Sequence, residues 1–170
     1  FIYPPYTLKE VFGELEKVGN VVQPLGLPYL ASVLEMAGKK VKIIDAQPLG
    51  YSIDDIIKEA KKFQPNIIGL SAVTPHFPKV ILVAKALKKE LNCLIIVGGP
   101  HVTAVKEEIM QGDCFDYAVI GEGEETILEL VEKIERNELD ALGEVKGIIF
   151  RKEGKVVITS PRPVSYTHLR

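Results

Sequence analysis

The sequence predicts an α/β fold in which helices cover both faces of a parallel five-stranded sheet. Short apolar runs alternate with segments whose apolar residues recur with the 3.6-residue period of a helix. Most of these runs are continuously apolar, which is typical of strands buried on both faces of a parallel sheet. The predicted strands are Ile2–Tyr3, Val41–Ile44, Ile67–Ser71, Leu94–Val97 and Tyr117–Ile120, and the predicted helices are Leu27–Met36, Ile53–Phe63, Val80–Leu91, Val105–Met110 and Thr126–Ile134.

Residues at the ends of two predicted helices support these boundaries. Gly38 follows the first helix, at a position where a left-handed C-terminal cap is favourable. Ser52 precedes the second helix and Asp55 stands three residues later, which is the spacing of a capping box. Strands and helices that alternate through short, right-handed connections predict a doubly wound sheet of the Rossmann-like or flavodoxin-like kind.

The pattern changes after Glu138. Val145–Phe150 and Val156–Ile158, joined by the turn sequence 152–155, predict a small β-hairpin. We therefore expect an α/β domain over residues 1–138, a hairpin extension packed on the same domain over 139–163, and a linker stub or added tail over 164–170. The chain opens at Phe1 without an initiator methionine, and we expect the beginning of the first strand to be missing upstream.

Composition limits the classes of partner. The chain has 170 residues, of which 46% are hydrophobic, and this suffices for one sizeable core. The 21 basic and 23 acidic residues leave a net charge of −2, which provides no field for nucleic acid or an anionic membrane. No apolar run is long enough to span a bilayer, and Cys93 and Cys114 fit neither a disulfide framework nor a Cys-x-x-Cys metal site. We expect a cytoplasmic protein with a small, weakly charged ligand.

The loops that follow the strands are the candidates for a binding site, because ligands of doubly wound sheets bind beyond the carboxyl ends of the strands. A long connection after the first strand leads to Gly26, at the start of a helix whose free N–H groups favour a polar or anionic group. Ser71 and Thr74 after the third strand offer hydroxyl groups. Gly98 and Gly99 after the fourth strand leave room for a bulky ligand.

Each of these loops also has a purely structural explanation. Gly121-Glu122-Gly123-Glu124 follows the fifth strand, and glutamates in the first turn of a helix complement its dipole. Serine and threonine cap helices, and a single glycine often marks only a turn. The sequence lacks both a GxGxxG after the first strand and a GxxxxGK[ST] loop, which disfavours nicotinamide and nucleoside triphosphate binding. The loops, taken singly, leave the ligand open.

Taken in order, the loops resemble one known family over about residues 2–162. The motifs that carry the resemblance are Pro24-Leu25-Gly26-Leu27-Pro28-Tyr29-Leu30-Ala31, Asp45, Ile68-Gly69-Leu70-Ser71, Val97-Gly98-Gly99-Pro100-His101 and Gly121-Glu122-Gly123-Glu124. Their order and spacing are similar to the N-terminal cobalamin-binding domain of cobalamin-dependent radical-SAM enzymes. The resemblance implies cobalamin as the ligand and, in the full-length protein, a C-terminal radical-SAM domain with a 4Fe-4S cluster and S-adenosylmethionine. The Cys-x-x-x-Cys-x-x-Cys motif of that domain does not occur in these 170 residues, so we expect a fragment that is not catalytic alone.

The resemblance also implies roles for individual residues. The wider cobalamin-binding fold often carries Asp-x-His-x-x-Gly after the first strand, with the histidine on cobalt. Here Val21 stands for the aspartate and Gln23 for the histidine, while Gly26 is kept. Because a carboxamide is a poor cobalt ligand, the resemblance implies base-off cobalamin without a histidine ligand, which suits methyl transfer or related radical chemistry.

By the same resemblance, hydroxyl and glycine residues after the third and fourth strands line the slot for the nucleotide tail, and Gly121 with Glu122 lies at the rim. The full set of expected cofactor-binding residues is Gln23, Leu25, Gly26, Ser71, Val73, Thr74, Gly98, Gly99, His101, Gly121 and Glu122, with no catalytic and no metal-ligating residue.

Two histidines and one aspartate have other interpretations. His76 and His101 each follow a strand, but a loop histidine that hydrogen-bonds locally is the commoner case, and we expect neither to ligate cobalt. For Asp45, at the end of the second strand, we expect a role in ordering the loop. Two alternative functions remain, namely a flavodoxin-like domain for another cofactor such as flavin, and a degenerate interaction domain without a ligand.

Overall fold

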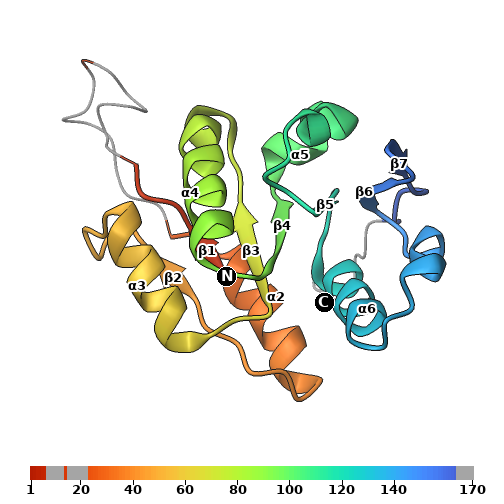
Figure 1. The fold of residues 1–170 in the computed structure, drawn as a ribbon, viewed down its shortest axis with the longest axis horizontal. Helices are drawn as coiled ribbons and strands as arrows, with labels where there is room; N and C mark the ends of the chain where they lie inside the picture. Colours follow the sequence, from red (N-terminus) through yellow and green to blue (C-terminus); the bar gives the residue numbers. More distant parts are fainter. Residues whose placement is uncertain (7–13, 15–22, 164–170) are drawn as a thin grey trace, which may run out of the picture.

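The computed structural model describes residues 1–6, 14 and 23–163. Within them, seven strands form one sheet in the order β2-β1-β3-β4-β5-β6-β7 (Figure 1). Strands β1 to β5 are mutually parallel, and β6 and β7 extend the sheet by antiparallel pairing. The strands are β1 Ile2–Tyr3, β2 Ile44–Asp45, β3 Ile67–Ser71, β4 Leu94–Gly98, β5 Tyr117–Val119, β6 Ile148–Lys152 and β7 Lys155–Ile158.

Helices cover both faces of this sheet. Helix α2 packs beside α6 on one face and α3 beside α4 on the other, and buried side chains form a main core cluster on each face. The α-helices are α2 Gly26–Met36, α3 Ile53–Phe63, α4 Phe77–Glu90, α5 Pro100–Val105 and α6 Glu124–Glu135, and the 3-10 segments are η2 Thr74–His76, η3 Lys106–Gln111 and η4 Leu139–Glu144. None of the described helices is long and apolar enough to cross a membrane. The doubly wound fold is confirmed, with the β2-β1-β3-β4-β5 order of flavodoxin-like proteins.

The predicted helix ends are present. The Ser52 hydroxyl accepts from the Asp55 N–H at 3.2 Å and the Asp55 carboxylate accepts from the Ser52 N–H at 3.0 Å, which completes the capping box. Gly38 adopts a φ of +78°, and the next N–H, of Lys39, donates to the carbonyl of Leu34 at 2.9 Å. This is the left-handed C-terminal cap that the glycine predicted.

Two predicted elements differ from the structure. The helix predicted at Val105–Met110 is wrong, because α5 begins at Pro100 and ends at Val105, and Lys106 then takes a φ of +49° and leads into η3. A proline suits the first helical position, since its missing N–H would have no partner there, and this explains the early start. The strand predicted at Val41–Ile44 is displaced to Ile44–Asp45, the two residues that pair with the two-residue β1.

The C-terminal hairpin joins the main sheet. Glu153 and Gly154 connect β6 to β7 with φ of +52° and +76°, as a two-residue hairpin turn of the I′ type requires. Because β6 pairs with β5, the sheet has seven strands and the predicted count of five is too low. Beyond β7, Arg162 donates to the Thr126 hydroxyl on α6 at 2.9 Å. The boundary at residue 138 stays a prediction, and the predicted tail 164–170 lies outside the described residues.

Candidate functional site at the carboxyl ends of the strands

A cavity of about 390 Å³ opens at the carboxyl ends of β1, β3, β4 and β5, on the face that α2 and α6 cover. The position is the switch point of the sheet, because the chain leaves β1 toward one face and β3 toward the other. Its volume lies within the range of small-ligand pockets, about 300–1,000 Å³. We call it the switch-point cavity.

Most of the residues predicted from the loops meet at this cavity. Those that line it are Gly26, Ser71, Val73, Gly98, Gly99, Gly121 and Glu122. The other four predicted residues lie outside the lining. Gln23 and Leu25 are exposed just before α2, with Leu25 66% accessible, and Thr74 and His101 lie to one side on η2 and α5. The structure thus brings together the four loops, though not every residue named on them.

The two consecutive glycines, Gly98 and Gly99, differ in what an added side chain would meet. Gly98 shares a face of β4 with Ile96, which lines the cavity, and a Cβ there would lie 3.7 Å from the Val119 carbonyl, an ordinary contact distance. At Gly99 a Cβ would lie 2.6 Å from the carbonyl oxygen of Ala72, and φ is +108°. Gly98 therefore keeps the cavity wall free of a side chain. The missing side chain of Gly99 would meet protein backbone, which corrects the expectation that both glycines clear the slot.

A threonine that the sequence reasoning missed connects two walls of the cavity. The Thr103 hydroxyl accepts from the Gly121 N–H at 3.0 Å and donates to the Gly99 carbonyl at 3.4 Å. It thereby joins the loop after β4 to the loop after β5. The sequence offered one indication of this role. Thr103 stands four residues after Gly99 near the start of a helix, where a threonine hydroxyl can donate to the carbonyl four residues earlier.

His101 is held beside the cavity by local contacts. Its Nδ1 lies 3.1 Å from the Thr74 hydroxyl, and its ring packs on Phe77 with centroids 4.1 Å apart. Burial lowers the pKa of His101 below its ordinary value, because desolvation disfavours the charged imidazolium. Thr74 and His101, which were both predicted to contact the cofactor, therefore contact each other.

An aromatic cluster surrounds His76 at the carboxyl end of β1. The His76 ring stacks on Tyr6 at 3.9 Å between centroids, and Tyr3 meets it edge-on at 6.1 Å. Asp45 ends β2 beside this cluster and accepts a hydrogen bond from the backbone of Gln47. Its Oδ1 is buried without a hydrogen-bond partner among the described residues, and burial raises the pKa of the carboxyl. Within the described ranges, no group of three or more His, Cys, Asp or Glu side chains could hold a metal ion.

Fold and cavity together define an open, doubly wound α/β domain built to receive a ligand at its switch point. Residues 14–131 match the B12 binding domain family, and the chain belongs to this family. The resemblance that the loop motifs predicted is thereby confirmed.

The curated relatives are longer proteins, and the chain spans about a third of their length. It is 40% identical over 152 residues to an uncharacterized methyltransferase of Pyrococcus horikoshii, covering 86% of this chain and 32% of that protein. It is 32% identical over 163 residues to the cytidylyl-2-hydroxyethylphosphonate methyltransferase of Streptomyces wedmorensis, covering 83% of this chain and 30% of that protein.

The solved structures that superpose on this chain are also longer proteins. The cobalamin-dependent S-adenosylmethionine radical enzyme OxsB, with aqua-cobalamin and S-adenosylmethionine bound, superposes with a TM-score of 0.73 at 27% identity, over 96% of this chain and 22% of that chain. The radical S-adenosylmethionine methyltransferase TsrM of Kitasatospora setae, with cobalamin and a 4Fe-4S cluster bound, superposes with a TM-score of 0.77 over 99% of this chain and 30% of that chain. At 16% identity the second likeness shows the fold alone.

Proposed function

We propose that this chain binds cobalamin with the nucleotide tail in the switch-point cavity and the corrin ring over the carboxyl ends of the strands. The observation that carries the proposal is the open cavity itself, in a chain of the B12 binding domain family, with Gly98 in place of a wall side chain. The Ser71 hydroxyl offers a hydrogen bond near the rim, and the apolar wall around Leu30 and Ile96 suits a heteroaromatic base.

We further propose that the bound cobalamin is base-off and has no protein histidine on cobalt. A tail base seated in the cavity is held away from the metal. Of the histidines in the described part of the chain, His76 is stacked in the tyrosine cluster and His101 is paired with Thr74. Gln23 stands where the wider fold carries its histidine, and an amide is a poor cobalt ligand.

In this proposal the chain serves as the cofactor-binding domain of a longer protein. When bound and reduced by an external electron donor, cobalamin without a strong lower donor would supply a nucleophilic cobalt centre for methyl-group chemistry. The residues of this chain hold and orient the cofactor, and a following radical-SAM domain supplies the cluster and S-adenosylmethionine. Methyl transfer or related radical chemistry by the longer protein is the proposed outcome. A Cys-x-x-x-Cys-x-x-Cys motif in the parent gene beyond Pro163 would support this part, and a different domain there would contradict it.

Two measurements test the cofactor proposal. Equilibrium dialysis against hydroxocobalamin and against flavin mononucleotide should show retention of cobalamin alone. Retention of flavin alone, or of neither ligand by a protein whose circular dichroism shows an intact fold, would contradict it. Electron paramagnetic resonance of bound cob(II)alamin should then lack nitrogen superhyperfine splitting, because no nitrogen lies on the cobalt axis. A nitrogen triplet would contradict the base-off, histidine-free state.

A further inference from the structure

The segment that follows β7 is joined to the start of a cavity loop. The Ser160 carbonyl accepts from the Gly147 N–H at 2.9 Å, and the Gly147 carbonyl accepts from the Ile120 N–H at 2.9 Å. Ile120 immediately precedes Gly121, where the loop after β5 begins to line the switch-point cavity. The segment therefore contacts, through Gly147, the residue that leads into this loop.

Arg162 joins the same segment to the other end of the loop, on α6. Its guanidinium donates from Nε to the Thr126 hydroxyl at 2.9 Å, and it forms ion pairs with Glu125 at 2.8 Å and Glu129 at 2.5 Å. Thr126 is fully buried in the first turn of α6, and its hydroxyl donates to the Lys146 carbonyl at 3.1 Å. The Arg162 side chain is only 14% exposed, so this is not a fully solvated ion pair of the kind that contributes little. One side chain thus anchors the start of α6 to a distant part of the chain.

The two attachments meet at a closely packed junction around Gly147. Its φ is +77°, and a Cβ there would lie 3.3 Å from the Ile120 carbonyl oxygen. The same Cβ would lie 3.4 Å from the Thr126 hydroxyl oxygen and 3.9 Å from the Cβ of Arg162. Because such packing leaves little free space, the end of β5, the start of α6 and the segment after β7 hold one another in place.

The loop between these attachments needs external restraint. Gly121 and Gly123 flank Glu122, and all three line the switch-point cavity. Two glycines in three residues give a backbone with many accessible conformations. A ligand that binds against a mobile wall loses affinity, because the wall must be ordered on binding. A loop that is held at both ends has lost most of this freedom before the ligand arrives.

We propose that Arg162 is a positioning residue for the cofactor, which fixes the loop after β5 as a wall of the cavity and thereby raises the affinity for the nucleotide tail. The proposal rests on cobalamin binding as proposed above. Arg162 lies outside the cavity lining, so it acts only through the loop and the start of α6. An arginine suits this role, because its planar guanidinium donates in several directions at once to a hydroxyl and two carboxylates.

Binding of two corrinoids to the parent and to Arg162→Met tests the role of this side chain. Hydroxocobalamin carries the nucleotide tail, and cobinamide has the same corrin ring without the tail, so the ratio of their dissociation constants isolates the tail. We expect Arg162→Met to reduce the preference for hydroxocobalamin by about 3- to 30-fold in an absorbance titration. Hydrogen exchange should also become faster at the Ile127 amide, which donates to the Gly123 carbonyl at 2.7 Å and joins the loop to α6.

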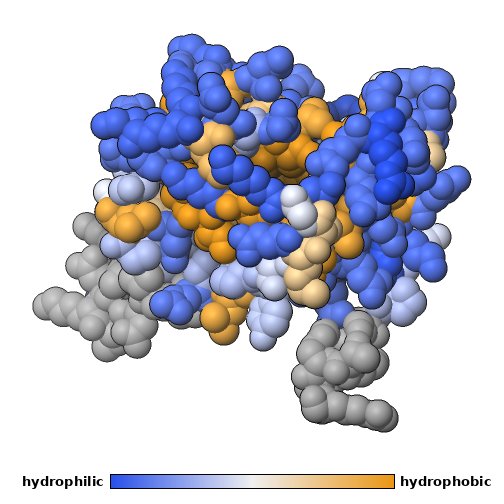
Figure 2. Space-filling model, turned by 90° about the horizontal axis from the view of Figure 1, so that it is seen from below, coloured by the Kyte–Doolittle hydropathy of each residue, from blue (hydrophilic) through white to orange (hydrophobic). Residues whose placement is uncertain are grey.

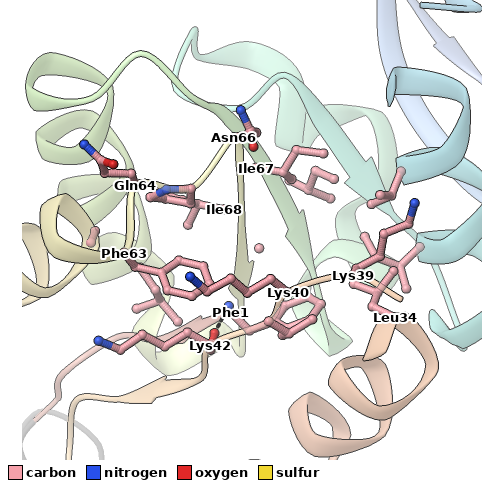
Figure 3. Close-up of a pocket in the computed structure, with 18 of the residues that line it drawn as sticks. Phe1, Leu34, Lys39, Lys40, Lys42, Phe63, Gln64, Asn66, Ile67 and Ile68 are labelled. Atoms are coloured by element: carbon pink, nitrogen blue, oxygen red, sulfur yellow. Dashed lines mark hydrogen bonds between the residues drawn. The ribbon is translucent and has the colours of Figure 1, made fainter. Parts of the chain in front are cut away.

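Lys39→Met is a matched control at the opposite end of the same helix. Lys39 forms an ion pair with Glu135, the last residue of α6, and its side chain is 26% exposed. It lines a pocket where the strands begin, together with Ile67, the first residue of β3 (Figure 3). Figure 2 views the molecule from this end, where hydrophilic side chains surround an apolar centre. Lys39→Met removes one cation, as Arg162→Met does, and should change neither the corrinoid preference by more than about twofold nor the exchange of Ile127.

The outcomes separate this inference from the proposed function. A folded parent that binds neither corrinoid, or only cobinamide, overturns the proposed function and the inference with it. A parent that binds both, together with an Arg162→Met protein that weakens both equally or keeps the parent ratio, overturns the inference alone. If Arg162→Met does not fold, the double variant Glu125→Gln and Glu129→Gln removes the two carboxylate partners from exposed positions on α6 and should lower the ratio in the same direction. A ratio equal to that of the parent would then contradict the role of Arg162.

Discussion

Replacing Gly98 with valine tests directly whether the nucleotide tail occupies the switch-point cavity. Gly98 is the last residue of β4, and its φ lies outside the left-handed region. A Cβ there would lie 3.7 Å from the carbonyl oxygen and 3.8 Å from the Cβ of Val119, so the protein meets the new Cβ only at ordinary contact distances. Valine also suits a strand better than glycine does. The change therefore acts on the cavity and only weakly on the fold.

The expected loss of affinity follows from the geometry. Three carbon atoms on the cavity wall would overlap a ligand that fills the slot, and overpacking of this kind costs about 1–3 kcal/mol. At 1.4 kcal/mol per tenfold change, the dissociation constant for cobalamin should rise roughly 5- to 150-fold. The free energy of unfolding should change by less than about 1 kcal/mol.

Absorbance titration with hydroxocobalamin measures the affinity, and urea unfolding measures the stability. Gly143→Val on η4 is a matched control, because a Cβ at Gly143 also meets nothing tighter than an ordinary contact and the residue lies outside the cavity lining. Gly99→Val is unsuitable, since its side chain would collide with the Ala72 backbone. If Gly98→Val binds cobalamin as tightly as the parent does, the tail does not lie in this slot.

Three further predictions concern the loops around the cavity. Thr103→Val removes the hydroxyl that accepts from the Gly121 N–H. Hydrogen exchange at that amide should become faster, and cobalamin should bind about 2- to 10-fold more weakly. An unchanged exchange rate would show that the hydroxyl does not order the rim of the cavity. Asp45→Asn should be at least as stable as the parent at pH 7. Burial raises the pKa of this carboxyl in the folded protein, so its favourable contribution is complete below the unfolded value of about 3.9 and is lost as the pH rises through the folded pKa. Urea unfolding at pH 4 and pH 7 measures this, and a parent that gains stability relative to the variant over that interval contradicts it. Gln23→His should introduce nitrogen splitting into the resonance of bound cob(II)alamin, and a spectrum like that of the parent would mean that this loop does not approach cobalt.

Local signals were sufficient wherever the determining residues are neighbours in sequence. The capping box at Ser52, the C-terminal cap at Gly38 and the Glu153-Gly154 turn each depend on a few consecutive residues. The general place of the site was also predictable, because parallel strands bring their carboxyl ends to one edge of the sheet whatever the details of packing. Most of the residues chosen from the loops after the strands therefore line the cavity.

The tertiary structure decided which side each loop residue faces. Gly98 and Gly99 are adjacent, chemically identical and both line the cavity, yet an added Cβ at Gly98 would make only ordinary contacts, whereas one at Gly99 would collide with the backbone of Ala72 in the loop after β3. Likewise, the bond from Gly121 to Thr103 and the pairing of β6 with β5 join segments that are distant in sequence. Such contacts depend on the packing of whole elements against one another, and no local pattern encodes them. The sequence by itself determined the fold class, the family and the edge that carries the site, whereas the set of residues that line the cavity at that edge follows only from the assembled sheet.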